Sequence, residues 1–412
     1  MARELIDVEV ARRIVLEHTK RLEDEEVPLR RALGRVLAAG VEATDPIPPF
    51  DNSAMDGYAV RAGDTAAASP GDPVRLTVVD ESRAGRPAAS VAGAGEAIAI
   101  STGAAIPGGC DAVVRKEDVH AVDGVIEVRA PIEPDRDVRH AGDDVQPGEV
   151  VMPAGTVIGA AELGVMASLG RAAARCSRAP RVAVLTTGDE LAKPGAPLGP
   201  GRIRDANAYS VPALAIAAGA NLTAMDHVGD DPKATLAAIQ GMLEADAVVV
   251  CGGVSVGEHD HVRPALERLG IGERFWGVAL RPGRPTWFGV GDDGPLVFGL
   301  PGNPVSAMVT FLLFVRPSLL AMSGAEPSAS RTSAVLDERY EKRPGRAHAV
   351  RVRLEPREDG WHALPTKEQG SHVLTSMLGA DALAFIPAEH GPVDAGERVE
   401  IELLERATMG AR

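Results

Sequence analysis

The spacing of hydrophobic positions changes several times along the chain, and each change marks a region. Residues 4–40 carry apolar side chains at helical spacing, which predicts two helices, the first capped by Asp7 and the second running from Arg31 to Ala39. The proline-rich segment 44–50 cannot be helical, and we interpret it as a linker. Residues 51–140 instead predict a small β-rich unit. Its short β-type runs are 74–80, 96–102, 111–117 and 124–130.

Residues 141–178 return to turns and one predicted helix, Ala160 to Leu169. If this stretch packs with the start of the chain, the β-rich unit between them is an insertion, and the sequence leaves that point open. Residues 180–325 then alternate buried strands, each a continuous apolar run, with helices. This order predicts a parallel sheet covered on both faces, whose ligands bind beyond the carboxyl ends of the strands.

After Ser323 the helical spacing disappears. The stretch 347–355 alternates strictly, and the alternation places Val350 on one side and Arg351 on the other. Two further strand-like runs follow, so residues 331–412 are predicted to form a small β-barrel or sandwich.

Composition limits the classes of function. The chain of 412 residues has 43 Lys or Arg and 58 Asp or Glu, which gives a net charge of −15, and only 3% aromatic residues. These values argue against binding to nucleic acid or to an anionic membrane surface. Three widely separated cysteines argue against a disulfide framework. The sequence shows no signal peptide and no apolar run near the roughly 20 residues that span a bilayer, so we expect a cytoplasmic protein.

Three of the predicted strands end in polar, glycine-rich loops, at 186–191, 251–261 and 300–306. The first offers hydroxyls and carboxylates, and the second offers free backbone N–H groups. The third starts a helix with Asn303 as the expected N-cap, and the free N–H groups at its positive dipole end suit an anion. One such loop is most often structural, whereas three on one sheet edge predict a site for a phosphorylated small molecule. The candidate binding residues are Thr187, Gly188, Asp189, Gly252, Gly253, Ser255, Pro301, Gly302, Asn303 and Ser306.

Two arginines, Arg281 and Arg284, flank a Pro-Gly turn between the second and third loops. Arginine pairs suit phosphate and other oxyanions, although two solvated surface arginines are an equally ordinary interpretation. A zinc site around His259 and His261 is a weaker hypothesis, because a third ligand at suitable spacing is missing.

Acidic and hydroxyl side chains also occur in turns outside the α/β region. Asp56 and Thr102 lie in the β-rich unit, and Asp143 and Asp144 lie just after it. Each has a plain structural interpretation as a turn or surface residue.

Six segments, in this order, resemble the molybdopterin molybdenumtransferase family, which is the MoeA and gephyrin E-domain family of molybdenum-cofactor biosynthesis. They are DNSAMDGYAVR, STGAAIPGGCDAVV, TTGDEL, CGGVSVGEHD, RPGRP and LPGNPVSA.

The resemblance implies a multidomain α/β plus β fold. It implies a helical linking and dimer region (1–45 and 141–178), an inserted β-rich domain (46–140), a parallel-sheet α/β molybdopterin-binding-type domain (179–328) and a C-terminal β-barrel domain (329–412). It also implies an elongated homodimer, in which the cleft joins the α/β domain of one subunit to the inserted domain of the other.

The implied reaction is a Mg²⁺- and molybdate-dependent hydrolysis of adenylylated molybdopterin that inserts molybdenum into the dithiolene and releases AMP. By the resemblance, Asp56, Glu190 and Asp260 would be metal ligands. Together with Thr102 and Asp144 they would form the catalytic set, with Asp143 as the alternative to Asp144. Either Asp230 or Asp231 matches a further acidic position, and the doubled aspartates leave that choice open. The implied substrate-binding residues add Arg281, Arg284 and Ser371.

The chain departs from the family pattern at a few positions. Arg281 and Arg284 stand where lysines are usual, and Gly277 stands where relatives often carry a basic residue. These changes bear on substrate affinity and leave the proposed metal ligands intact.

Two alternative functions compete with the insertase. A molybdopterin adenylyltransferase would be supported by residues 180–325 alone. A non-catalytic cofactor carrier or scaffold would have no need of the acids at 56, 190 and 260. The expected partners beyond the substrates are a molybdopterin adenylyltransferase and apo-molybdoenzymes.

Overall fold

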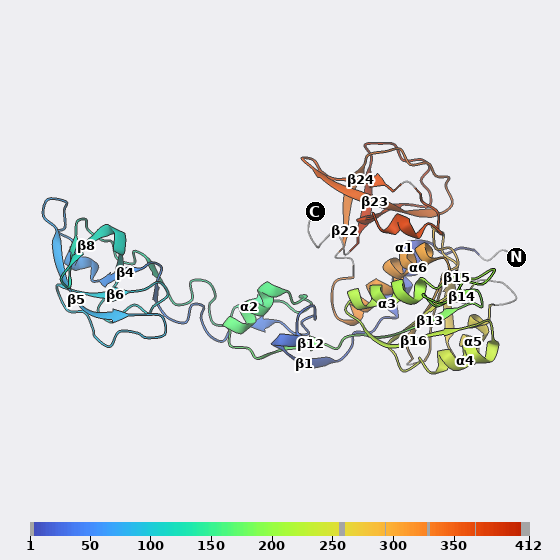
Figure 1. Cartoon of the computed structure of the whole chain (residues 1–412), viewed down its shortest axis with the longest axis horizontal. Helices are drawn as coiled ribbons and strands as arrows, with labels where there is room; N and C mark the ends of the chain where they lie inside the picture. The colour runs from blue at the N-terminus through green and yellow to red at the C-terminus, as the bar shows by residue number, and fades with distance from the viewer. Residues whose placement is uncertain (1–3, 255–259, 293, 328–329, 367, 405–412) are drawn as a thin grey trace.

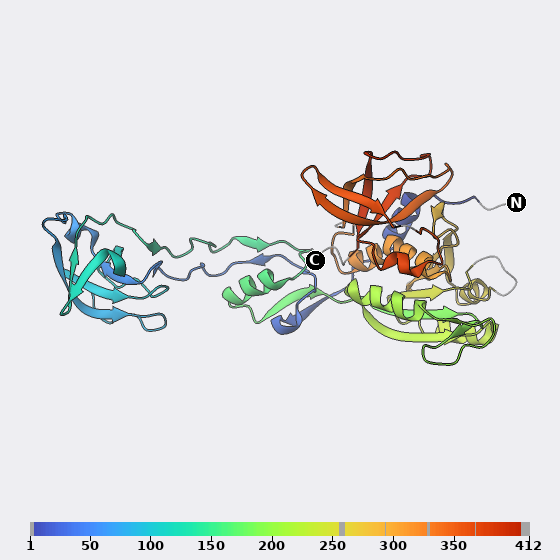
Figure 2. The same cartoon turned by 45° about the horizontal axis from the view of Figure 1, so that its top comes forward.

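The computed structural model describes residues 4–254, 260–292, 294–327, 330–366 and 368–404. The molecule is elongated (Figure 1): the inserted β unit lies at one end, a small linking region lies in the middle, and the α/β domain and the C-terminal barrel lie together at the other end. Extended segments join the inserted unit to the linking region, as Figure 2 shows. The multidomain fold class expected from the sequence is confirmed, while the residue bounds of the domains stay predictions.

The α/β domain is built on a six-stranded sheet in the order β16-β13-β17-β21-β20-β18. The first four strands are parallel, which confirms the predicted parallel sheet. Of the last two, β20 runs antiparallel to β21, and β18 runs antiparallel to β20; the sequence analysis missed both as strands. The strands are β13 (Arg181–Thr187), β16 (Asn221–Val228), β17 (Ala247–Cys251), β18 (Gly272–Trp276), β20 (Trp287–Val290) and β21 (Leu296–Leu300).

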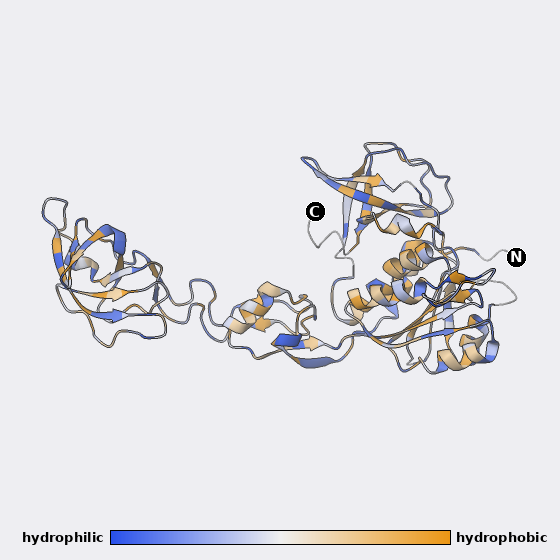
Figure 3. Cartoon of the chain, viewed as in Figure 1, coloured by the Kyte–Doolittle hydropathy of each residue, from blue (hydrophilic) through white to orange (hydrophobic). Residues whose placement is uncertain are grey.

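Helices cover both faces of this sheet. Along β13, Val182 and Val184 are buried with the helices of one face, whereas Ala183 and Leu185 are buried with those of the other. A strand with two buried faces reads as a continuous apolar run, which is the pattern that predicted it. The first face holds α1 (Val8–Glu17), α3 (Asn207–Ala217) and α6 (Pro304–Thr310), and the second holds α4 (Pro232–Gln240) and α5 (Val262–Arg268). Figure 3 shows the hydrophobic residues gathered on these elements.

The apolar run 304–315 stops at Arg316, but the helix that begins at Pro304 continues beyond it. It continues through a π-helical turn into α7 (Arg316–Met322), 19 residues in all. By length and composition it could cross a membrane, but 78% of its most apolar window is buried inside the protein. It therefore serves as a core helix, and Arg316 is accommodated because its guanidinium donates to Ser330 Oγ at 2.8 Å.

The linking region joins two distant parts of the chain, as an insertion requires. β1 (Asp24–Pro28) pairs with β12 (Ala173–Ser177), and β2 (Val41–Glu42) pairs with β11 (Val150–Met152). The helix predicted from Ala160 is confirmed as α2 (Ala160–Ser168).

The prediction of a helix from Arg31 to Ala39 is wrong. A single 3₁₀ turn covers Leu29–Arg31, and Gly34 then adopts a φ of +76° that no helix permits. Beyond it, Val36 and Leu37 form β-bridges to Val157 and Cys176. Pairing with the second half of the linking region therefore outweighs the local helical preference.

The inserted unit is a six-stranded sheet in the order β7-β4-β6-β5-β9-β8, and all four predicted β-type runs belong to it. The strands are β4 (Gly57–Val60), β5 (Val74–Ser82), β6 (Glu96–Ile100), β7 (Ala112–Arg115), β8 (Val119–Val122) and β9 (Val125–Val128). Where the chain enters and leaves the unit, β3 (Asn52–Ser53) pairs with β10 (Val138–Arg139).

The C-terminal domain is a closed barrel, because the strand order β23-β24-β22-β26-β25 is completed by pairing of β25 with β23. The strands are β22 (Arg331–Leu336), β23 (Ala347–Arg357), β24 (Gly360–Pro365), β25 (Ala382–Ile386) and β26 (Arg398–Leu403). The alternation predicted for β23 fails at Arg351, which was expected on the outer side and is only 1% exposed. That outer side faces the α/β domain, where β19 (Leu280–Arg281) pairs with β23.

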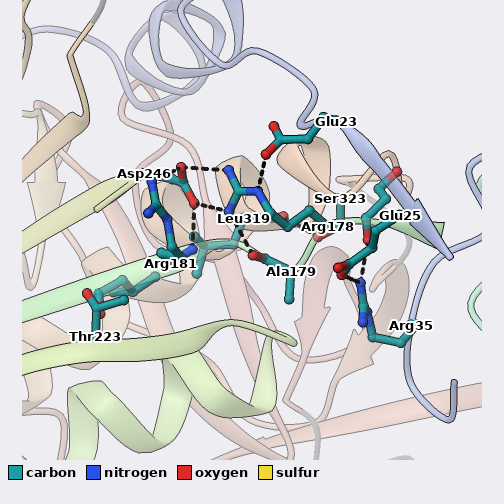
Figure 4. A network of polar contacts seen from close by, with 12 residues as sticks. Glu23, Glu25, Arg35, Arg178, Ala179, Arg181, Thr223, Asp246, Leu319 and Ser323 are labelled. Carbon is teal, nitrogen blue, oxygen red and sulfur yellow. Dashed lines mark hydrogen bonds and ion pairs between the residues drawn. The ribbon is translucent and has the colours of Figure 1, made fainter. Parts of the chain in front are cut away.

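A network of charged side chains fixes the point where the linking region meets the α/β domain (Figure 4). Arg178 lies between Glu23 and Asp246, donating to Glu23 Oε1 at 2.6 Å and to the two Asp246 oxygens at 2.8 and 2.9 Å. Nearby, Arg35 donates to Glu25 at 2.5 Å and to the Ser177 carbonyl at 2.7 Å. Arginine side chains thus bond to both segments that join the linking region to the α/β domain, at Glu23 and at Ser177.

Candidate functional site

The carboxyl ends of β13, β17 and β21 meet at one edge of the sheet and form the floor of the candidate site. Gly252 and Gly253, with φ of +93° and +64°, follow β17 and pass over Thr187. A side-chain carbon at Gly252 would lie 2.9 Å from Thr187 Oγ1, and one at Gly253 would lie 3.0 Å from it. Glycine is therefore required at both positions, and these residues come together as predicted.

The third loop adjoins this floor. A side-chain carbon at Gly302 would lie 3.8 Å from the Gly252 Cα, while Pro301 and Ser306 are buried beside it. Pro304 begins the helix with Asn303 at the cap position, as predicted, but the Asn303 side chain makes no capping bond. Its amide donates instead to Ser371 Oγ at 3.2 Å. The structure thus brings Ser371, from the C-terminal domain, to the edge of the floor.

The first loop gathers the acidic groups. A side-chain carbon at Gly188 would lie 2.3 Å from Glu190 Oε2, so the carboxylate of Glu190 folds back over the glycine. Asp189 Oδ1 accepts a bond of 3.1 Å from the Asp230 amide. Asp231, by contrast, caps α4 by accepting from the Ala234 amide at 2.7 Å. Of the two doubled aspartates, Asp230 therefore belongs to this acidic loop.

Other predicted site residues lie in or directly after the segment 255–259, which is outside the described residues. Asp260 lies two residues before α5, and a side-chain carbon at Gly253 would lie 2.7 Å from Val262, the first residue of that helix. Ser255 and His259 lie outside the described residues, so the predicted role of Ser255 and the zinc hypothesis stay untested there. Within the described ranges no cluster of three or more His, Cys, Asp or Glu side chains could hold a metal ion.

Asp56 and Thr102 form a pair within the inserted unit. Asp56 Oδ1 accepts from the Thr102 amide at 2.6 Å and from Thr102 Oγ1 at 2.9 Å. These bonds from Thr102 hold the pKa of Asp56 below its ordinary value, so the carboxylate is ionised. The inserted unit, which carries this pair, lies at the opposite end of the molecule from the α/β domain, which carries Glu190 and Asp260 (Figure 1). A single chain therefore does not bring these groups together.

Asp143 and Asp144 lie between these two locations. Both are exposed where the chain returns from the inserted unit, and Asp143 Oδ2 accepts from the His140 amide at 2.7 Å. The Asp144 amide donates to the Ile47 carbonyl at 2.9 Å, and no residue in the described ranges forms a hydrogen bond with its carboxylate.

A cavity of about 650 Å³ lies between the α/β domain and the barrel, and Arg281 and Arg284 both line it. The turn 342–346 of the barrel adds three more cations, Lys342, Arg343 and Arg346, and Glu341 beside it is paired with Arg339 at 2.7 Å. No described carboxylate forms an ion pair with Arg281 or Arg284. The predicted arginine pair is therefore part of a larger cationic cavity.

Buried groups around this cavity show its positive potential. Burial, together with Arg281 and Lys342, lowers the pKa of His348 to about 4, so the ring is neutral. Burial also lowers the pKa of Arg351 to about 10. Arg351 lies on β23, as does the cavity residue His348, and it donates to the Gly370 carbonyl at 3.3 Å, next to Ser371. Strand β23 therefore reaches from the cavity to the floor.

Sequence reasoning missed several residues of this region. The cations of the 342–346 turn form a basic run that could have been noticed, whereas the burial of Arg351 could not have been. Asp205 and Asn207, at the start of α3, are each 7% exposed, and Asn207 donates to the Gly302 carbonyl at 2.8 Å. The only sequence signal for these two residues is that polar side chains occur at the start of an apolar helix. Gly277 has a φ of +83°, a conformation in which a basic residue would be strained.

Three family models match successive parts of the chain. They are described as the MoeA N-terminal region (domain I and II), over residues 6–170; a probable molybdopterin binding domain, over 183–321; and the MoeA C-terminal region (domain IV), over 333–404.

Curated relatives and solved structures agree with these matches. The chain is 36% identical over 386 residues to a molybdopterin molybdenumtransferase of Haemophilus influenzae, covering 92% of this chain and 93% of that one. It is 36% identical over 405 residues to molybdopterin molybdenumtransferase 2 of Mycobacterium tuberculosis, covering 96% and 98%. The crystal structure of a molybdopterin biosynthesis MoeA protein from Pyrococcus horikoshii superposes with a TM-score of 0.82 at 35% identity, covering 97% and 99%. The chain belongs to the molybdopterin molybdenumtransferase family.

Proposed function

We propose that this protein inserts molybdenum into molybdopterin while hydrolysing adenylylated molybdopterin, and that each reaction site is shared between two copies of the chain. As a member of its family, the protein is a transferase of molybdenum-cofactor biosynthesis. The observation that carries the finer proposal is that one strand, β23, carries both His348, which lines the cationic cavity, and Arg351, which donates to the Gly370 carbonyl beside Ser371 at the floor.

The floor suits the phosphoanhydride of an adenylylated substrate. Gly252, Gly253 and Gly302 allow close approach of a ligand to the backbone. The start of the 19-residue helix, whose cap side chain is turned toward Ser371, leaves N–H groups for phosphate oxygens.

The acidic groups suit a hard divalent cation. Glu190 lies at the carboxyl end of β13, and Asp260 lies before α5, so the α/β domain supplies two of the proposed oxygen ligands. Mg²⁺, when bound there, would neutralise charge that develops on the phosphate oxygens. Around it, Asp189 orders the loop by accepting from the Asp230 amide.

The cationic cavity suits molybdate, a tetrahedral dianion. Guanidinium groups bind oxyanions through paired hydrogen bonds. Glu341 also lines the cavity, but its carboxylate accepts from Arg339 at 2.7 Å and forms no ion pair with Arg281 or Arg284. Lys342 is partly occupied, since its ammonium donates to the Pro387 and His390 carbonyls at 2.7 Å each. The arginines are therefore the groups proposed to hold the metal oxyanion close to the floor.

The third proposed metal ligand requires a second subunit. Asp56 is ionised and held by Thr102. The inserted unit that carries it lies at the opposite end of the molecule from the α/β domain of the same chain. A homodimer in which the inserted unit of one subunit reaches the α/β domain of its partner would bring the pair to the floor. The exposed Asp144, on the returning segment, would then approach the same cleft.

The reaction can be tested directly with purified protein. Adenylylated molybdopterin, Mg²⁺ and molybdate are supplied, and released AMP and pterin-bound molybdenum are measured. We expect molybdate-dependent AMP release with formation of metallated cofactor, loss of both for Glu190→Gln, and no change for the surface control Glu267→Gln. Nucleotide binding without any turnover by the unaltered protein would contradict the proposal and indicate a carrier.

A further inference from the structure

A second cavity, of about 660 Å³, lies at the carboxyl ends of β13 and β16. It lies on the β16 side of β13, whereas the floor described above lies on the β17 side. The chain covers it with the segment 191–204, in which β14 (Leu191–Ala192) pairs with β15 (Ile203–Arg204). A volume of this size accommodates a nucleoside-sized group.

The cavity wall is mostly apolar. Its lining residues include Val184, Pro194, Pro197 and Met225. Tyr209 also lines the cavity and is 59% exposed. Flat apolar walls with an aromatic ring suit a planar heterocycle, because ring faces stack and pack without needing hydrogen bonds.

A chain of three polar side chains crosses one wall of this cavity. Thr186 Oγ1 donates to Asp205 Oδ2 at 2.6 Å. Thr186 Oγ1 also lies 3.3 Å from His227 Nδ1. Thr186 is 1% exposed and Asp205 is 7% exposed, so water does not compete for these bonds. Asp205 is held in place by a further bond of 3.0 Å from the Ala208 amide.

The order of donors in this chain follows from its chemistry. A hydroxyl has one hydrogen, and the carboxylate of Asp205 can only accept, so the hydrogen of Thr186 points to Asp205. Thr186 Oγ1 must then accept from His227 Nδ1, so in the imidazole form the single ring hydrogen lies on Nδ1. Nε2 is left as an acceptor, and no described residue forms a hydrogen bond with it.

We infer that His227 determines specificity in this second cavity by accepting a hydrogen bond, through Nε2, from an N–H group of a planar fused nitrogen heterocycle. The inference rests on the proposed function, whose substrate has such a heterocycle at each end. Adenine presents an exocyclic amine, and the pterin presents a ring N–H and an amine. The cavity adjoins the acidic loop through Leu191, so a ring bound there would lie next to the floor.

The test compares ligands that differ only in the donor. AMP is paired with purine riboside 5′-monophosphate, which lacks the amine. Pterin is paired with a trimethylated pterin that has no N–H at that edge. We expect the unaltered protein to bind the donor-bearing member of one pair about tenfold tighter, as one hydrogen bond to a buried site provides. In His227→Phe, which keeps a ring of similar size, the preference should fall to about one.

Further variants separate positioning from folding. Thr186→Val removes the hydroxyl that orients the imidazole and should abolish the preference, whereas Thr186→Ser should keep it. His227→Gln keeps an acceptor and should retain part of the preference. His120→Phe, at an exposed site in the inserted unit, is the matched control and should bind all four ligands as the unaltered protein does.

Each outcome decides the inference. A preference within the nucleotide pair assigns the cavity to the adenine end, and one within the pterin pair assigns it to the pterin end. Equal binding within both pairs, no binding of any ligand, or a preference that survives His227→Phe would overturn it. Failure of the proposed function gives a different result, since the preference would then be observed without molybdate-dependent AMP release.

Discussion

Replacing Arg178 with Met should loosen the junction between the linking region and the α/β domain. The substitution keeps the apolar stem of the side chain and removes its two bonds to Asp246, of 2.8 and 2.9 Å. Asp246 has a side chain only 11% exposed, and it would retain the Arg181 amide at 2.7 Å as a partner. The lost bond to Glu23 counts for little, because that side chain is 70% exposed.

The expected magnitude follows from these contacts. Hydrogen bonds to charged groups contribute about 1.5–3 kcal/mol, and removing one partner of a fully buried pair costs about 3–5 kcal/mol. Since Arg181 partly compensates, we expect a loss of about 2 kcal/mol for local opening, which corresponds to about a thirtyfold larger open population.

The opening can be measured by proteolysis with a glutamate-specific protease. Strand β1 contains Glu25 and Glu26, which should become accessible when the junction opens, and the substitution creates no new cleavage site. Arg13→Met is the control, because its pairing with Glu17 at 3.9 Å joins two exposed side chains. Equal cleavage rates in Arg178→Met and Arg13→Met would refute the reasoning that this network holds the junction.

The same pair predicts a dependence on pH. Burial alone would raise the pKa of Asp246, but the bonds from Arg178 and the Arg181 amide outweigh it and hold the pKa below its ordinary value. A carboxyl with a lowered pKa stabilises the folded state above its unfolded pKa, about 3.9, and loses that contribution as the pH falls further. Arg178→Met should therefore show a shallower loss of junction stability in acid than the unaltered protein.

Three further predictions concern other parts of the molecule. Arg281→Gln should weaken molybdate binding at least about tenfold, measured by calorimetry, since one oxyanion contact is lost; unchanged affinity would exclude it from the oxyanion site. Bonds to Asp337 and Asp359 raise the pKa of His362, so its stabilisation is complete below the unfolded pKa of about 6.5 and is lost as the pH rises through the folded value. His362→Gln should remove that part of the dependence of Tm on pH, and an unchanged profile would contradict it. Glu402→Gln, within 3.0 Å of Arg12 in a buried network, should destabilise the barrel by about 3 kcal/mol in urea unfolding, whereas a loss under 1 kcal/mol would contradict the assignment.

The parts of the fold that could be predicted are those whose pattern is set locally. Both faces of β13 are buried, so it reads as a continuous apolar run, and Asp7 caps α1 as its position suggested, accepting from the Glu9 amide at 2.8 Å. The helix expected from Arg31 failed because Leu37 pairs with Cys176, a partner that is far away in the sequence.

The candidate site likewise contains residues that the sequence could predict and residues that it could not. Thr187, Gly252 and Gly302 could be placed together, because the carboxyl ends of parallel strands share one sheet edge. Arg351 could not, since its burial depends on the packing of the barrel against the α/β domain. His227 was also missed, because its significance depends on a bond to Thr186 on the neighbouring strand.

The measurement that tests the central claim most directly is complementation between two inactive variants. Asp56→Ala and Glu190→Ala are purified separately, mixed, allowed to exchange subunits, and assayed for molybdate-dependent AMP release. If each site takes Asp56 from one subunit and Glu190 from its partner, half of the randomly formed dimers carry one intact site, and the mixture should recover about a quarter of the unaltered activity. No recovery after proven exchange would contradict a site shared between two copies of the chain.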